Sequence, residues 1–261
     1  MIKPLTKYEW TMEVFMRNIK LTIEYDGSRY SGWQRLGKDE TNNTIETKIT
    51  EVLNKMVGHE VELNCGCRTE NGVHAYEQVA NFKENIALKP YEIKNYLNRF
   101  LPMDIAILNV EDMPERFHAS LNAKSKTYVY RIATGAVPSV FTRKYTYYSF
   151  DELDIPAMKK AAKYLIGKHD FKYFSTVKKS KSTEKEIYSI DFIKSNDELR
   201  IEICANDFLH NMTRMIIATL MDIGLHKEEA DVILDIFNTK SPVITTSIAE
   251  AKGLFLQKIN Y

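Results

Sequence analysis

Residues 61–82 read VELNCGCRTENGVHAYEQVANF, and this stretch decides the kind of fold. The short runs at 61–65 and 76–82, rich in Val, Leu, Tyr and Phe, are typical of β-strands. Between them lies a polar loop, 68–74, with an Asn-Gly pair at its tip. Asn and Gly favour turns because both tolerate positive φ. The stretch therefore predicts two strands joined through a loop of charged and polar side chains.

The residues around this stretch complete a first α+β unit. The expected order is a strand at 18–25, a helix at 44–57, the two strands above, a helix at 89–100 and a strand at 105–110. The first helix is predicted because apolar residues recur at helical spacing up to Gly58, a residue type that commonly ends helices. Pro90, near the start of the second helix, suits a first helical turn, where its missing N–H is not needed.

The pattern then begins again in the second half of the chain. We expect a strand at 125–132, a helix at 155–166, a hairpin of 189–195 and 199–204, helices at 208–223 and 227–237, and a strand at 254–259. Each half thus offers strands and helices in an order similar to β-α-β-β-α-β. The predicted fold class is α+β, with two similar ferredoxin-like-type domains whose mainly antiparallel sheets flank a central basic cleft.

We expect the chain to divide into three parts. They are an N-terminal extension at 1–17, an α+β domain at 18–112 that carries the polar loop, and an α+β domain at 113–261. The link between the two domains has no Gly/Ser-rich tract, so we expect them to pack together.

Composition and motifs exclude several classes of protein. Lys and Arg number 36 against 35 Asp and Glu, so a nucleic-acid partner would have to meet local positive charge. The three cysteines are too few for a secreted disulfide framework and lack zinc-binding spacing. The sequence contains no run of about 18 apolar residues, so no membrane span is predicted. Glycine-rich phosphate-binding and dinucleotide-binding motifs are absent. We expect a cytoplasmic protein without a metal.

The polar loop brings Arg68, Glu70 and His74 into one short segment. One interpretation is an exposed turn with scattered surface charge. The other is a loop that holds Glu70 in a cleft with Arg68 beside it, because loops carried on rigid strands often hold functional groups.

Residues 68–75, RTENGVHA, resemble the Arg-Thr-Asp-Ala-Gly-Val-His-Ala signature of the TruA-type tRNA pseudouridine synthases. Glu70 stands in the place of the signature aspartate, and Asn71 in that of the alanine. Other segments similar to the family follow in its order, at 24–35, 78–82, 101–105, 117–119, 128–131, 167–171, 211–216 and 253–256. The resemblance spans about residues 18–256. We call residues 68–75 the signature loop.

The resemblance implies an enzyme that isomerises uridine to pseudouridine in the anticodon arm of tRNA. Such an enzyme breaks the N1–C1′ bond, rotates the base and rejoins it through C5, with no metal or organic cofactor. Glu70 takes the place of the essential aspartate, which acts as nucleophile or base on the ribose. Arg214 matches the arginine that pairs with this carboxylate. Tyr128 matches a tyrosine that stacks on the target base and is implicated in removing the C5 proton. The resemblance also implies a homodimer.

Contact with RNA is expected from basic residues near these positions. The predicted RNA-binding residues are Arg68, Arg29, Arg35, Lys124, Lys126 and His74. The resemblance implies that Arg68 displaces the target base from its stack. For His74 we expect a structural or backbone-contacting role rather than acid–base chemistry.

The glutamate at position 70 leaves the activity open. Its side chain is one methylene longer than that of aspartate, and a 1 Å misplacement of reacting atoms can cost about 100-fold in rate. Ser120 and Thr127 also stand where the family often has basic residues. Three alternatives follow: an active synthase, a catalytically silent tRNA-binding or RNA-binding paralogue with a chaperone-like role, and an enzyme that forms a base-to-sugar carbon bond on a free nucleotide.

Overall fold

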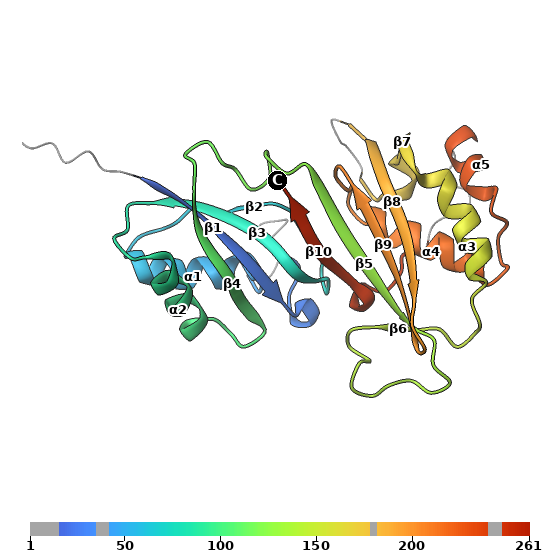
Figure 1. Cartoon of the computed structure of the whole chain (residues 1–261), viewed down its shortest axis with the longest axis horizontal. Helices are drawn as coiled ribbons and strands as arrows, with labels where there is room; N and C mark the ends of the chain where they lie inside the picture. The colour runs from blue at the N-terminus through green and yellow to red at the C-terminus, as the bar shows by residue number, and fades with distance from the viewer. Residues whose placement is uncertain (1–15, 35–41, 178–181, 240–246) are drawn as a thin grey trace, which may run out of the picture.

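The computed structural model describes residues 16–34, 42–177, 182–239 and 247–261 (Figure 1). Within them, ten strands form one sheet in the order β4-β1-β3-β10-β5-β9-β8-β7, with β2 paired to β3 and β6 to β5. The strands are β1 (Arg17–Tyr25), β2 (Asn64–Cys65), β3 (His74–Glu84), β4 (Ile105–Met113), β5 (Ser125–Ala133), β6 (Tyr147–Tyr148), β7 (Gly167–Asp170), β8 (Glu184–Lys194), β9 (Glu198–Ala205) and β10 (Leu254–Asn260). Neighbouring strands are antiparallel except β3 with β10 and β5 with β6.

The helices lie beside the two halves of this sheet. They are α1 (Ile45–Val57), α2 (Pro90–Phe100), α3 (Ile155–Ala162), α4 (Met212–Gly224) and α5 (Val232–Thr239). Figure 1 shows α1 and α2 beside the β4-β1-β3 half, and the other three beside the β9-β8-β7 half. The limits of α1 follow from its caps, because Thr44 Oγ1 accepts the Thr47 N–H at 3.2 Å and Gly58 is left-handed at φ 88°. The α+β class with a mainly antiparallel sheet is confirmed.

The last strand, β10, joins the two halves. It runs parallel to β3, with Phe255 opposite His74, and antiparallel to β5, with Leu254 opposite Tyr130. Figure 1 shows it at the centre of the sheet, far along the chain from the strand β3 that it pairs with. One hydrophobic cluster of buried side chains extends through both halves. The halves therefore share one sheet and one core, and the division after residue 112 stays a prediction.

Several element boundaries differ from those expected. The strand predicted at 61–65 is confined to β2, because the Val61 N–H donates to Asn54 Oδ1 at 2.8 Å instead of to a neighbouring strand. The helix predicted from residue 208 begins at Met212, because Asn211 has φ 62° and a left-handed residue cannot continue an α-helix. The helix predicted from residue 227 begins at Val232. The short strands β6 and β7 were not predicted.

Candidate active site

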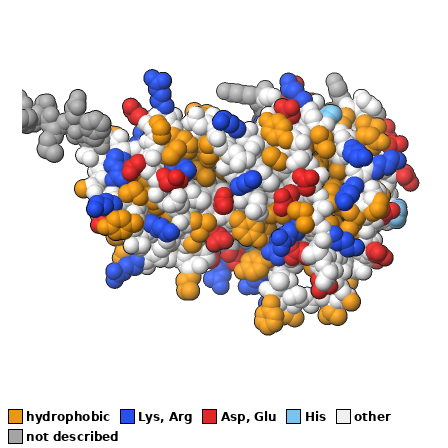
Figure 2. All heavy atoms as spheres, viewed as in Figure 1, with side chains coloured by type: hydrophobic (Ala, Val, Ile, Leu, Met, Phe, Trp, Pro, Cys, Tyr) orange, Lys and Arg blue, Asp and Glu red, His pale blue; other side chains and the backbone are white. Residues whose placement is uncertain are grey.

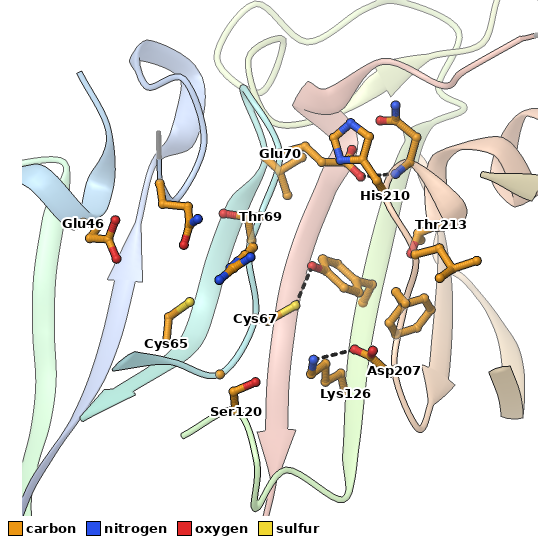
Figure 3. Close-up of a pocket in the computed structure, with 18 of the residues that line it drawn as sticks. Glu46, Cys65, Cys67, Thr69, Glu70, Ser120, Lys126, Asp207, His210 and Thr213 are labelled. Carbon is orange, nitrogen blue, oxygen red and sulfur yellow. Dashed lines mark hydrogen bonds and ion pairs between the residues drawn. The ribbon is translucent and has the colours of Figure 1, made fainter. Parts of the chain in front are cut away.

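A cavity of about 1340 Å³ lies between the two halves (Figure 3). Its wall is built from residues within 62–73 and 207–214, together with Lys126 and Tyr128 of β5 and Glu46 of α1. These segments are far apart along the chain, so the cavity exists only once both halves have folded together. We call it the central cavity.

The signature loop is held in place by residues of β1, β3 and the turn after β1. The backbone N–H of Trp33 donates to the Thr69 carbonyl at 3.0 Å, and the Thr69 hydroxyl contacts the Tyr25 hydroxyl at 2.7 Å. The side-chain amide of Gln78 makes two hydrogen bonds to the backbone of Cys67, which directly precedes the loop. That amide donates to the Cys67 carbonyl at 2.6 Å and accepts the Cys67 N–H at 3.3 Å. The backbone that carries the loop side chains is thus fixed by the surrounding fold.

Glu70 extends from this loop into the central cavity, where it meets the start of α4 (Figure 3). Its Oε2 lies 3.2 Å from Arg214 Nη1, and its Oε1 accepts the Asn211 N–H immediately before the helix. Arg214 is also anchored by a 2.6 Å hydrogen bond from Nε to the Ala249 carbonyl. The Glu70 and Arg214 side chains are 16% and 18% exposed, so the ion pair is largely buried but still reached by solvent. The guanidinium and the helix N-terminus both stabilise negative charge at this point.

Tyr128 lies on β5, and its side chain forms part of the cavity wall. Its hydroxyl is 3.1 Å from Cys67 Sγ, and its ring packs edge-to-face against Phe208 with centroids 5.1 Å apart. The residue is only 6% exposed. Burial, reinforced by the neighbouring Cys67, raises the pKa of Tyr128 well above its ordinary value. Tyr128 is therefore a neutral phenol at physiological pH.

Two lysines share one carboxylate at the other end of the cavity. Asp207 Oδ1 lies 2.6 Å from Lys126 Nζ, and Asp207 Oδ2 lies 2.7 Å from Lys185 Nζ. Burial alone would raise the pKa of Asp207, but the charges and hydrogen bonds of Lys126 and Lys185 together outweigh it, and the pKa is lowered. Lys126 is correspondingly held in place by Asp207 (Figure 3).

The comparisons with known proteins agree with one another. A sequence model of the family described as tRNA pseudouridine synthase matches residues 21–122 and 161–261, which is more than half of the chain. The chain is 44% identical over 248 residues to tRNA pseudouridine synthase A 2 of Bacillus anthracis, covering 94% of this chain and 100% of that relative. This chain belongs to the tRNA pseudouridine synthase family.

A second relative has the same degree of similarity. The chain is 44% identical to tRNA pseudouridine synthase A 1 of Clostridium tetani, over 94% of this chain and 100% of that relative. Among solved structures, the archaeal box H/ACA sRNP Nop10–Cbf5 complex has a TM-score of 0.35 at 9% identity, over 78% of this chain and 44% of that one. A likeness at that level adds nothing to the family assignment.

In this member of the tRNA pseudouridine synthase family, five of the predicted site residues meet at one cavity. They are Glu70, Arg214, Tyr128, Arg68 and Lys126. Arg68 is exposed, and its positive charge acts on the half-buried Glu46, which also lines the cavity. Burial nevertheless raises the pKa of Glu46 above its ordinary value. The charged loop is thus a cavity wall, not an exposed turn with scattered charge.

The predicted RNA-binding residues are spread more widely. Lys126 lines the cavity, whereas Arg29 and Lys124 are both exposed and lie outside its lining. Arg35 lies outside the described residues. His74 requires a correction, because it is 1% exposed and cannot touch RNA in this structure.

The His74 ring has a structural role at the join between β3 and β10. Its Nδ1 accepts the Gly27 N–H at 3.1 Å, and its ring stacks on Phe255 with centroids 4.5 Å apart. Burial lowers the pKa of His74 below its ordinary value. No local pattern indicated this burial, because His74 stands in a polar loop and its cover comes from the other end of the chain.

The cleft was predicted to be basic, and this too is corrected. Among the described residues, the charged side chains of the cavity wall are Glu46, Glu62, Glu70 and Asp207 against Arg68, Lys126 and Arg214. Lys and Arg are likewise interspersed with Asp and Glu over the face seen in Figure 2. Among the described residues of the cavity wall, positive charge is therefore not in excess.

Three residues of the site were not singled out from the sequence: Cys67, Asn211 and Asp207. Cys67 was considered only as one of three thiols, and all three cysteines are free. Asn211 precedes an apolar helix, where its ability to adopt positive φ was the available signal. Asp207 carried no signal, because its two lysine partners come from other strands.

Two further findings concern metal ions and membranes. In the described part of the chain, no group of three or more His, Cys, Asp or Glu side chains is arranged to hold a metal ion. Searching the same residues finds no helix with the length and apolar character needed to span a membrane.

Proposed function

We propose that this chain is an active tRNA pseudouridine synthase that isomerises uridine in the anticodon arm of tRNA, with Glu70 as its reacting carboxylate. The observation that carries this proposal is the Glu70–Arg214 ion pair at 3.2 Å inside the central cavity. A carboxylate that faces a cavity and is oriented by a guanidinium can act on the ribose of a bound nucleotide, as nucleophile or as base. Family membership supports this assignment.

The reaction needs a site that binds both the sugar and a rotating base. The N1–C1′ bond breaks, the base turns, and a C5–C1′ bond forms while the C5 proton leaves and N1 gains a proton. A neutral phenol such as Tyr128 provides a flat wall for the base but does not take up a proton as a phenolate would. We therefore assign Tyr128 to stacking, which is worth roughly 1–3 kcal/mol per base.

Arg68 is the residue best placed to help a nucleotide enter. It is exposed at the cavity wall, two residues from Glu70. A base within a folded arm must leave its stack before it can be reached, at a cost of a few kcal/mol. We propose that Arg68 occupies the space left by the displaced base or pairs with its phosphate, and that Lys126 contributes a second cation. A cytoplasmic homodimer remains part of the proposal and is tested by sedimentation equilibrium and by fractionation.

The catalytically silent paralogue is not favoured. It would be supported by a Glu70 carboxylate turned away from the cavity, or by one without a guanidinium beside it. Both oxygens of Glu70 instead have partners at the cavity. The relatives are named as synthases that act on tRNA, which also argues against a free nucleotide as substrate.

Tritium release from unmodified tRNA labelled at uridine C5 tests the function. We expect the wild-type protein to release tritium, Glu70→Ala to release none above background, and Glu70→Asp to retain release because it keeps a carboxylate. Glu77→Ala is the matched control, because Glu77 is an exposed glutamate on β3 outside the cavity lining. Equal release by Glu70→Ala and wild type would reject Glu70 as the reacting group. No release by wild type from any tRNA would reject the function.

A further inference from the structure

Asn211 stands between the two members of the Glu70–Arg214 ion pair and contacts both. Its backbone N–H donates to Glu70 Oε1, and its Oδ1 accepts from Arg214 Nη1 at 3.2 Å. The same Nη1 also donates to Glu70 Oε2. One guanidinium nitrogen, one carboxylate and one asparagine therefore form a closed set of hydrogen bonds at the edge of the central cavity.

The backbone of Asn211 aims its N–H at Glu70. The residue has φ 62° and directly precedes α4. The first N–H groups of a helix have no partner within the helix, and they lie at the positive end of its dipole. The left-handed conformation therefore places an unused donor against the carboxylate. Residues other than glycine seldom adopt this conformation, and asparagine is one of the few that do so readily.

The carboxamide of Asn211 is used at both ends. Its Oδ1 accepts from Arg214, and its Nδ2 donates to Thr176 Oγ1 at 2.9 Å. A hydrogen bond in which the donor is a guanidinium is stronger than one between neutral groups. With both ends engaged, the amide cannot rotate without losing a contact. It therefore restrains the same Arg214 nitrogen that donates to Glu70.

We propose that Asn211 is a positioning residue, which holds Glu70 and Arg214 in their reactive arrangement by combining a left-handed backbone with an acceptor for Arg214 and a donor for Thr176. This inference rests on the proposed function. Glycine supplies the backbone conformation but no side chain. Ionised aspartate accepts hydrogen bonds but cannot donate one to Thr176. Asparagine meets all three requirements.

Two substitutions separate the backbone from the side chain. Asn211→Gly keeps the left-handed conformation and removes the carboxamide. Asn211→Ala removes the carboxamide and also strains the backbone at positive φ. We expect both to lower kcat for tritium release to a similar extent, roughly 10- to 100-fold, the factor expected for losing a hydrogen bond to a charged group. The Kd for tRNA should stay within about twofold of wild type, while Tm falls for Asn211→Ala and stays near wild type for Asn211→Gly.

The control is Asn196→Gly, which removes an exposed carboxamide in the turn between β8 and β9 and should leave kcat unchanged. If kcat instead follows Tm, with Asn211→Gly as active as wild type, Asn211 is only structural and the proposal is overturned. If Asn211→Ala does not fold, the comparison of Asn211→Gly with wild type still decides. These outcomes require a wild-type protein that releases tritium, so they are distinct from failure of the proposed function.

Discussion

At position 70 the carboxylate is carried on a side chain one methylene longer than aspartate, and it spans the two halves of the molecule. Glu70 begins in the N-terminal half and ends at Arg214 and the Asn211 N–H, both from the C-terminal half. Arg214 in turn is restrained by Ala249 and Asn211, so the glutamate meets partners that are already fixed. The release rate of Glu70→Asp measures how closely the loop has adapted to glutamate.

The contact between Cys67 and Tyr128 leads to a prediction at the same scale. Each of Cys67→Ala and Tyr128→Phe should lower the free energy of unfolding, because each removes one partner of the 3.1 Å contact inside the core. Residues in direct contact couple, so the double variant should differ from the sum of the single effects by about 0.5–3 kcal/mol. Urea unfolding measures all four proteins of this cycle.

The matched control replaces a cysteine that does not touch Tyr128. Cys204 lies on β9 opposite Thr127, and these two side chains point to the same face of the sheet. Tyr128 follows Thr127 on β5, so its side chain points to the other face. Cys204→Ala and Tyr128→Phe should therefore have additive effects. Additivity in the Cys67 cycle as well would show that its contact with Tyr128 contributes nothing to stability.

At the scale of elements, the turn after β1 supports the signature loop through one close approach. Gly32 has φ 91°, and a Cβ placed on it would lie 2.7 Å from the Thr69 carbonyl oxygen. Backbone atoms cannot move aside as a flexible side chain can. The turn and the loop can therefore pack together only if position 32 has no side chain.

Gly32→Ala and Gly58→Ala together isolate the effect of this close approach. Gly58 has a similar φ of 88°, but no atom lies within 4 Å of the place that a Cβ would take there. Gly58→Ala should lower the free energy of unfolding by about 1–2 kcal/mol, the cost of a left-handed alanine. Gly32→Ala should lower it further and also reduce kcat, because a displaced Thr69 moves Glu70. Equal stability losses in urea unfolding, with kcat unchanged in both variants, would contradict this account.

At the scale of the whole molecule, the shared sheet predicts cooperative unfolding. The strand β10 pairs with both halves, and one hydrophobic cluster runs through them. In a Trp10→Phe variant, the buried Trp33 is the single tryptophan and reports on the N-terminal half. We expect its fluorescence and far-UV circular dichroism, which reports on both halves, to follow one transition in urea. Two separate transitions would show that the halves are independent domains despite the common sheet.

Much of the local structure could be predicted from the sequence, because its causes are local. Alternating residues indicated β1, helical spacing between Thr44 and Gly58 indicated α1, and the polar loop between β2 and β3 stood out by composition. The signature loop also carried the family resemblance, which the comparisons confirm. Boundaries failed where a single residue changed the backbone, as at Asn211, whose left-handed conformation delays the start of α4.

By itself, then, the sequence determined the types of the longer elements, the family and the identity of the charged loop, since periodicity, caps and short motifs act over a few residues. The tertiary structure alone decided that β10 enters the middle of the sheet, that His74 is buried beneath Phe255, and that Asn211 joins Glu70 to Arg214. Those facts depend on which segments meet across more than a hundred residues. Such meetings follow from burying a common core, which no local pattern encodes.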